Sequence, residues 1–284
     1  MKKLFTTAII IASSLGYGQE KLENSLLWEI SGKDIKTSYL YGTIHATCNN
    51  ELNSNVKKAL QETKNLYLEL DMDDSNMQAK MMSQTMMPEG KTIKNLTSEE
   101  EYKILDEFFT KEAGMSIAML NNMKPMILSS MLIPKMLDCP MKSVEAGLMS
   151  QVKTENEEVY GLETIEDQFA AFDAIPYKDQ VKDLVRLAKE GMQKSKDNFQ
   201  NLLKIYQSEN IEKLLDETSK EENGIMASYL DDFLTKRNKN WIDKITNASK
   251  KERSFFGVGA AHLAGEDGVI NLLRKEGYTV KAVK

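Results

Sequence analysis

The spacing of apolar and polar positions changes along the chain and marks the elements that it predicts. Over residues 25–30 and 37–44, apolar, β-branched and aromatic residues cluster on either side of a Gly-Lys-Asp turn, which predicts a β-hairpin. Residues 53–63 place apolar side chains on one helical face and predict a capped helix, and residues 66–71 predict a strand that ends in acidic residues. Together these segments predict a strand, helix and strand unit near the start of the chain.

The end of the chain follows the same plan. Residues 254–258 predict a strand, residues 267–275 a helix and residues 278–283 a further strand. In each unit a Gly-x-x-His tetrapeptide lies where the first strand ends, and the two tetrapeptides are Gly42–His45 and Gly259–His262. If both strands join one sheet, the two histidines emerge at equivalent strand ends, where open α/β sheets bind their ligands.

The chain between the two units is mostly helical in its pattern. Fourteen of the 17 methionines lie between Met72 and Met149, which fits a soft helical core, a groove for a peptide or lipid, or a copper site. A short strand is predicted over 158–162, and long amphipathic helices follow. We predict an α+β fold with a mixed central sheet built from the two strand, Gly-x-x-His, helix and strand units. A helical insertion over about 72–155 and further helices over about 164–250 complete it.

The first residues predict a signal peptide. Two lysines precede a short apolar stretch over residues 4–15, and small residues stand at positions 16 and 18, as signal peptidases require. Cleavage after Gly18 would remove residues 1–18 and leave residues 19–284 as one domain, periplasmic or secreted. A retained membrane anchor is the alternative, although the apolar run is shorter than the roughly 20 residues that span a bilayer.

Composition narrows the class of protein further. A hydrophobic content of 41% over 284 residues is enough to build a core, so a disordered chain is excluded. The 37 basic residues against 43 acidic ones give a net charge of -6, which disfavours a nucleic-acid partner. No later segment of the sequence could span a membrane after signal cleavage. Cys48 and Cys139 form a disulfide in one interpretation and remain buried thiols in the other.

The only two histidines of the chain are the first candidates for chemistry. Two imidazoles and one carboxylate hold zinc, manganese or iron and leave a coordination position open for water. His45, His262 and Glu69 match that inventory. A hydrogen-bonded structural histidine is the alternative for each ring. The shared glycines, Gly42 and Gly259, favour a functional site, because glycine permits a tight turn and close approach of a substrate.

Three more polar residues are candidates for the same site. Glu163 closes a predicted strand and would act as a general base or a further ligand, the alternative being a cap on the helix that starts at Thr164. Arg237 and Asn238 lie on a predicted helix with Trp241 and would hold an oxyanion or a substrate carboxylate, the alternative being an exposed arginine. The sequence contains no Gly-x-Ser-x-Gly elbow, phosphate-binding loop or Rossmann fingerprint.

Six motifs follow one another in a characteristic order. They are Leu27–Gly32, Ser38–His45, Leu68–Asp71, Gly161–Thr164 with Gln168, Arg237–Asn238 with Trp241 and Ile245, and Val258–Leu263. In this order they resemble the TraB/GumN family, which is related to the TIKI proteins, and they span nearly all of the predicted mature chain. Lys236 departs from the family pattern, because many members carry Glu at that position.

The resemblance implies a TIKI-like metalloprotease superfamily fold, in which the two Gly-x-x-His motifs and acidic residues form the active centre. TIKI-like members are divalent-metal-dependent peptidases, and TraB-like members are associated with inhibiting or sequestering peptide pheromones. Erythromycin esterases and a haem-binding ChaN-like group also look related.

The residues and the resemblance together predict an exported metal-dependent hydrolase that acts on peptides or another small substrate. His45, His262 and Glu69 would hold Mn, Co or Zn, and Glu163 would act as the acid/base. Arg237 and Asn238 would polarise the scissile carbonyl. One alternative is a non-catalytic protein that captures a peptide, or haem ligated by the two histidines. Another is a metal-free esterase with His45 as its general base, whose activity would survive chelators.

Overall fold

The computed structural model describes residues 21–152, 158–220 and 224–284. Across these residues the chain forms one mixed sheet of six strands in the order β4-β3-β5-β2-β1-β6. The strands are β1 (Leu27–Ser31), β2 (Ser38–Thr43), β3 (Asn65–Leu68), β4 (Val159–Gly161), β5 (Ser254–Gly259) and β6 (Thr279–Ala282). The predicted signal peptide over residues 1–18 lies outside the described residues.

Strand direction places the two histidine motifs side by side. Strands β4, β3, β5 and β2 run parallel to one another, whereas β1 is antiparallel to both β2 and β6. Thr43 at the end of β2 pairs with Gly259 at the end of β5. The predicted hairpin and the predicted mixed sheet are therefore confirmed, and the segments that follow β2 and β5 leave the same edge of the sheet.

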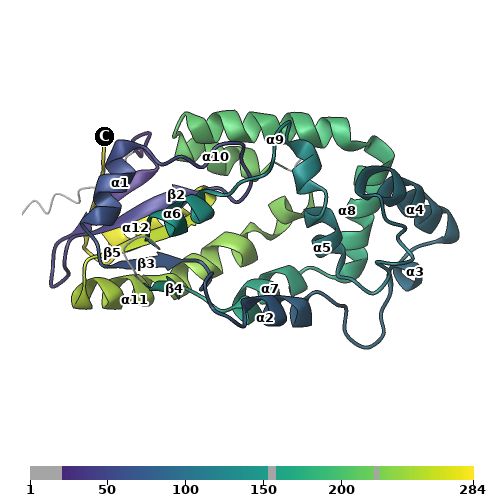
Figure 1. The fold of residues 1–284 in the computed structure, drawn as a ribbon, viewed down its shortest axis with the longest axis horizontal. Helices are drawn as coiled ribbons and strands as arrows, with labels where there is room; N and C mark the ends of the chain where they lie inside the picture. Colours follow the sequence, from purple (N-terminus) through teal and green to yellow (C-terminus); the bar gives the residue numbers. More distant parts are fainter. Residues whose placement is uncertain (1–20, 153–157, 221–223) are drawn as a thin grey trace, which may run out of the picture.

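Helices make up most of the remaining chain. They are α1 (Ser54–Gln61), α2 (Met77–Gln84), α3 (Ile93–Leu96), α4 (Glu99–Ala113), α5 (Pro125–Ser130), α6 (Val144–Val152), α7 (Ile165–Asp173), α8 (Tyr177–Glu190), α9 (Met192–Gln207), α10 (Ile211–Thr218), α11 (Lys236–Lys251) and α12 (Val269–Lys275). Figure 1 shows the sheet at one end of an elongated molecule and α3, α4, α5 and α8 at the other. None of the helices in the described part of the chain is long and apolar enough to cross a membrane.

Each end of the molecule has its own large hydrophobic core, and smaller clusters lie between them. The sheet core contains Trp28, Leu40 and Phe255, which are fully buried because helices cover the sheet. The helical core, with Phe109 and Leu184 at its centre, joins α4, α5 and α8. The methionines of the insertion are divided, since some join this second core and others, such as Met82 and Met119, are exposed.

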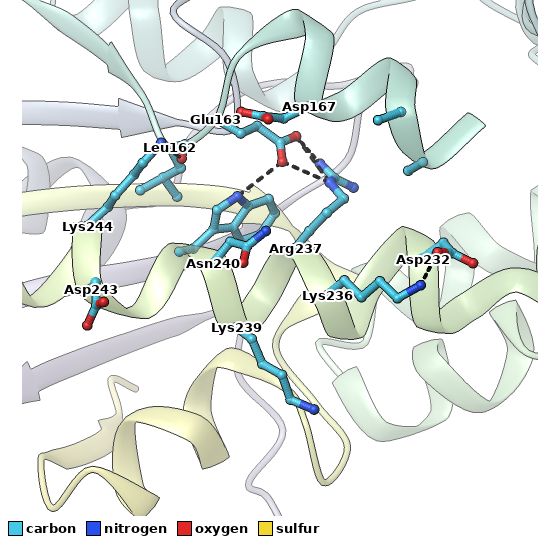
Figure 2. Close-up of a pocket in the computed structure, with 13 residues that line it drawn as sticks. Leu162, Glu163, Asp167, Asp232, Lys236, Arg237, Lys239, Asn240, Asp243 and Lys244 are labelled. Atoms are coloured by element: carbon cyan, nitrogen blue, oxygen red, sulfur yellow. Dashed lines mark hydrogen bonds and ion pairs between the residues drawn. The ribbon is translucent and has the colours of Figure 1, made fainter. Parts of the chain in front are cut away.

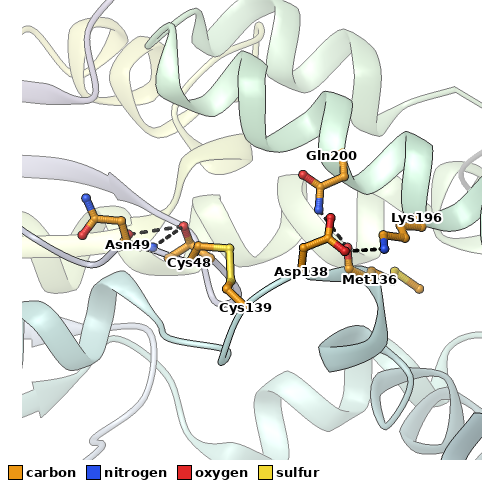
Figure 3. The surroundings of a disulfide bond; sticks show 8 residues. Cys48, Asn49, Met136, Asp138, Cys139, Lys196 and Gln200 are labelled. Atoms are coloured by element: carbon orange, nitrogen blue, oxygen red, sulfur yellow. Dashed lines mark hydrogen bonds and ion pairs between the residues drawn. A yellow bond between two sulfur atoms is a disulfide. The ribbon is translucent and has the colours of Figure 1, made fainter.

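A disulfide bond joins Cys48 to Cys139 and crosslinks two segments that are far apart in the sequence. Figure 3 shows the bond between the loop that follows β2 and the segment that precedes α6. Beside it, Thr47 and Lys142 exchange two backbone hydrogen bonds of 2.9 and 2.8 Å. The loop that carries His45 is therefore tied covalently and by backbone pairing to the start of α6.

Candidate functional site

Polar residues that follow four neighbouring strands gather at one edge of the sheet. His45 follows β2, Glu69 follows β3, Glu163 follows β4 and His262 follows β5. Because these strands are parallel neighbours, their carboxyl ends lie together, and this is the edge where α/β sheets bind ligands. The sheet brings together residues separated by more than 200 positions.

Arg237 is the centre of this group. Its Nη2 lies 2.5 Å from Glu69 Oε2 and 2.5 Å from Glu163 Oε1, and its Nε donates to Glu163 Oε2 at 3.0 Å. The side chains of Arg237, Glu69 and Glu163 are only 11%, 8% and 5% exposed. Charge-assisted bonds in such a buried setting are strong, so one guanidinium fixes the separation of both carboxylates. Figure 2 shows the Glu163 carboxylate directed at the guanidinium.

A local irregularity in the backbone positions Arg237. The turn immediately before α11, Asp231–Thr235, is a π-helix, a feature that is frequent at functional sites. Arg237 Nη1 donates to the backbone oxygen of Phe233 in this turn at 2.9 Å. One turn further along α11, the Trp241 ring lies 4.9 Å from the guanidinium carbon, and its Nε1 donates to Glu163 at 3.2 Å. The start of α11 therefore holds both the arginine and one carboxylate.

Glu69 is held from the opposite side by the second Gly-x-x-His motif. The backbone N–H of Gly259 donates to Glu69 Oε1 at 2.7 Å. A Cβ atom at position 259 would lie 3.2 Å from that oxygen, which is tighter than ordinary packing, so glycine is the residue that permits this approach. Gln168 of α7 donates to Glu69 and to Glu163 at 3.3 Å each.

His262 is buried and held in one orientation. Its Nδ1 lies 2.6 Å from Asn238 Oδ1, and its ring packs 4.6 Å from the Trp241 ring. The amide nitrogen of Asn238 donates to the backbone oxygen of Asp267 at 2.8 Å, so its oxygen is the atom that faces the histidine. His262 Nδ1 therefore carries the proton, and Nε2 is left as an acceptor, 3.3 Å from Arg237 Nη1.

His45 differs from His262 in its exposure. Its side chain is 70% exposed, and its Nδ1 lies 2.8 Å from Oε1 of the buried Glu145 on α6. Sequence reasoning did not identify Glu145. The available signal is that Glu145 is the one charged residue in the mostly apolar segment Val144–Val152. A lone charge in an apolar helix is costly to bury and usually has a partner.

The surroundings push the pKa values of the two central carboxyls apart. Burial alone would raise the pKa of Glu69, but nearby positive groups, including Arg237, and the Gly259 N–H outweigh it and lower the pKa to about 2. Burial, together with the negative charge of Glu69, raises the pKa of Glu163 despite its bonds to Arg237. A carboxylate that stays ionised beside one that protonates more readily is the arrangement used for acid/base chemistry.

The pKa values of the two histidines also move in opposite directions. Loss of water around His45 works against its charged form, but the contact with Glu145 outweighs this and raises the pKa to about 9. Burial, reinforced by the positive charge of Arg237, lowers the pKa of His262 to about 3. At neutral pH His262 is therefore a neutral ring, and the exposed His45 is biased toward the cation.

The low pKa of His262 predicts a loss of stability in mild acid. Below about pH 6.5 the unfolded chain takes up a proton on His262, whereas the folded protein does so only near pH 3. The contribution of the neutral His262 ring to the free energy of unfolding is complete above pH 6.5. It falls as the pH decreases, by at most about 1.4 kcal/mol per pH unit. We expect urea unfolding between pH 7 and pH 5 to show this slope, and His262→Gln to flatten it.

His45→Gln is the matched control. The raised pKa of His45 acts on the alkaline side, because the folded state keeps its proton between about pH 6.5 and pH 9. Its loss should therefore leave the acid slope unchanged, and no third imidazole exists in the chain. An equal acid slope in wild type and His262→Gln would contradict the assignment.

The imidazoles fit a divalent metal better than the central carboxylate does. In metal sites the ring nitrogen that does not bind the metal usually donates to an oxygen, and both histidines place Nδ1 against a side-chain oxygen. Glu69, by contrast, is already bonded to Arg237 and Gly259. Within residues 21–152, 158–220 and 224–284, no three His, Cys, Asp or Glu side chains are grouped so that they could hold a metal ion.

A pocket of about 600 Å³ reaches the group from the α7 and α11 side. Glu163, Arg237 and Trp241 line its inner part, and charged residues of both signs line its outer part. Figure 2 shows Lys236 paired with Asp232 and Lys239 pointing away from the centre. This mixed lining suits a polar ligand more than an apolar one.

The predicted site residues separate into one connected group and one neighbour. Direct contacts join the predicted residues Glu69, Glu163, Arg237, Asn238 and His262. His45 lies beside this group and is paired with a different carboxylate, that of Glu145. Its charge is close enough to influence the pKa of Glu69. The roles predicted for these residues stay predictions.

Comparison with known proteins points to one family. The sequence profile of the TraB/PrgY/gumN family matches residues 26–282. Metalloprotease TIKI1 of Xenopus tropicalis is 22% identical over 90% of this chain and 61% of its own length. Metalloprotease TIKI1 of Homo sapiens is 22% identical over 93% of this chain and 63% of its own length. The Metalloprotease TIKI homolog of Amphimedon queenslandica is 21% identical over 98% of this chain and 66% of its own length. The chain thus spans less than two thirds of these relatives, and no solved structure matches it significantly.

Proposed function

Because the chain belongs to the TraB/PrgY/gumN family and is distantly similar to proteins named metalloproteases, we propose that it is an exported, metal-dependent hydrolase that cleaves peptides. The observation that carries the proposal is the meeting of two histidines and two carboxyl groups at the edge of the sheet. In the histidine pair and in the carboxyl pair, one pKa is raised and the other is lowered, as acid/base chemistry requires.

His45 and His262 would hold a divalent ion such as Mn, Co or Zn, the latter through the Nε2 atom that faces Arg237 Nη1 in this structure. The ion would supply Lewis acidity and a more acidic bound water. The chain provides the remaining functions. Glu163 has a raised pKa and lines the pocket, so it exchanges the proton with the substrate. Glu69 remains ionised and, through Arg237, keeps Glu163 in place.

We propose positioning roles for Arg237 and Asn238, and their contacts support these roles. The three guanidinium nitrogens of Arg237 are hydrogen-bonded to the two carboxylates, to the Phe233 backbone oxygen and to the His262 ring. Asn238 uses its oxygen on His262 and its nitrogen on backbone oxygens. With these polar atoms engaged, we propose that the two residues orient Glu163 and His262 rather than polarise the scissile carbonyl directly.

Two features support export. The N-terminal pattern of two lysines, an apolar stretch and small residues is typical of a signal peptide. Disulfides such as the Cys48–Cys139 bond persist in oxidising compartments and are rare in the cytosol.

The proposal predicts that His45→Gln, whose amide can still face the buried Glu145, abolishes peptide cleavage and leaves the fold intact. The His45 side chain is 70% exposed, so its replacement leaves little cavity, whereas an equivalent change at the buried His262 would also disturb packing. The purified mature protein is incubated with a peptide library and analysed by mass spectrometry. Chelation should stop cleavage in wild type, and Mn, Co or Zn should restore it.

Asn49→Ala is the matched control, because Asn49 is exposed in the same loop and contacts none of the candidate residues. It should cleave like wild type. Peptides that bind without being cut would contradict the hydrolase and favour a capture protein, and a Soret band after haem addition would favour the haem alternative. Cleavage that survives chelation would contradict the metal requirement.

A further inference from the structure

Glu145 is a buried carboxylate with few polar partners. The residue is 6% exposed, and its Oε1 faces the His45 ring, whereas its Oε2 and the nearby Thr43 hydroxyl are buried without a hydrogen-bond partner among the described residues. Its charge is offset by the ion pair with His45 Nδ1 at 2.8 Å. Burying a carboxylate in this way costs stability, so its presence needs a reason other than stability.

The segments that carry the two partners are held in a fixed register. Val144, one residue before Glu145, donates its backbone N–H to the oxygen of Ile44, one residue before His45, at 3.1 Å. The disulfide fixes the same two segments a few residues away, as Figure 3 shows. On the other side, a Cβ atom at Gly147 would lie 2.4 Å from the backbone oxygen of Asn50. The contact between Glu145 and His45 is therefore built into the backbone and is not a chance surface pair.

The second histidine is held in a corresponding way. Asn238 Oδ1 lies 2.6 Å from His262 Nδ1, as Glu145 Oε1 lies 2.8 Å from His45 Nδ1. In both rings the side-chain oxygen lies on the Nδ1 side, which leaves Nε2 as the acceptor, and on His262 that atom faces Arg237 Nη1 at 3.3 Å. This is the pattern by which an outer partner selects the tautomer of a functional histidine.

We infer that Glu145 is a positioning residue that holds His45 with its proton on Nδ1 and its Nε2 directed to the candidate site. The inference rests on the proposed function for its consequence, because a hydrolase needs that Nε2 atom. Its structural part can be tested without any activity. Loss of outer partners of this kind typically costs about 10- to 100-fold in activity or metal affinity.

The decisive variant is Glu145→Gln, which keeps the shape of the side chain and removes its charge. In wild type, nitrogen-detected NMR of the two imidazoles, at a pH where His45 is neutral, should place its proton on Nδ1. In Glu145→Gln the proton should be shared between Nδ1 and Nε2, while the His262 signals stay unchanged. The thermal midpoint should remain equal to wild type or rise, because a poorly compensated buried charge is removed.

Glu51→Gln is the control, since Glu51 is an exposed glutamate near His45 in sequence, whereas the carboxylate paired with His45 is that of Glu145. It should alter neither the tautomer nor the midpoint, and Glu145→Asp should restore part of the wild-type tautomer preference. An unchanged His45 tautomer in Glu145→Gln, or a midpoint that falls, would overturn the inference. If wild type shows the expected tautomer but cleaves no peptide, the hydrolase proposal fails while the role of Glu145 stands.

Discussion

Replacing Arg237 by methionine is expected to lower the free energy of unfolding by about 3–5 kcal/mol, because two buried carboxylates would lose their shared cation. Glu69 and Glu163 are each less than a tenth exposed, so water cannot take the place of the guanidinium. The two negative charges would also repel each other directly. Urea unfolding monitored by circular dichroism at pH 7 measures the loss, and peptide cleavage should disappear with it.

Two further variants test the cause. Arg186→Met removes an arginine from a more exposed cluster with Asp183 and Glu190, and should cost less than about 1 kcal/mol. The double variant Glu163→Gln with Arg237→Met removes one of the two carboxylate charges that are left without a cation, and it should regain part of the lost stability. A single Arg237→Met variant within about 1 kcal/mol of wild type would show that the buried network is not a major source of stability.

Removing the disulfide is expected to have an effect of similar size. The Cys48–Cys139 bond closes a loop with a sequence separation of 91 residues. The chain-entropy treatment gives about 4–5 kcal/mol for a loop of this length, mainly because the unfolded chain gains freedom when the crosslink is lost. We expect the Cys48→Ser/Cys139→Ser double variant to unfold at correspondingly lower urea concentration. The ion pair between His45 and Glu145 should loosen as well, since the bond joins their segments.

Reductant supplies the internal control for this experiment. It should lower the stability of the wild-type protein toward that of the double variant and leave the double variant unchanged. Alkylation followed by mass spectrometry, with and without reductant, shows directly whether the two thiols are protected. Thiols that are alkylated equally in both conditions would contradict the disulfide, and a double variant as stable as wild type would contradict its energetic role.

The elements of the sheet were accessible from the sequence because their signals are local. Apolar runs with β-branched and aromatic residues predicted the hairpin and the strands that became β2 and β5, and the Gly-x-x-His tetrapeptides placed both histidines at strand ends. The boundaries were less accurate. The predicted strand over residues 66–71 ends at Leu68, and Glu69 follows it, where its carboxylate accepts from the Gly259 backbone.

The chemistry of the site was only partly accessible. Glu69, Glu163, Arg237, Asn238 and His262 were identified as candidates from residue type and motif, but nothing in their spacing indicates that one guanidinium joins both carboxylates. Glu145 was missed altogether, because its partner His45 lies 100 positions earlier in the chain. Ion pairs depend on distance in space, and a motif contains no information about that distance.

Residue order was thus sufficient to predict strands, helices, the α+β class and the edge of the sheet where polar groups collect, since each depends on neighbours within a few positions. The tertiary structure alone decided which of those groups touch, how far each is buried and in which direction its pKa moves. Burial and charge act through space, and they are set by side chains from β-strand ends, α6, α7 and α11 that meet only when the chain is folded.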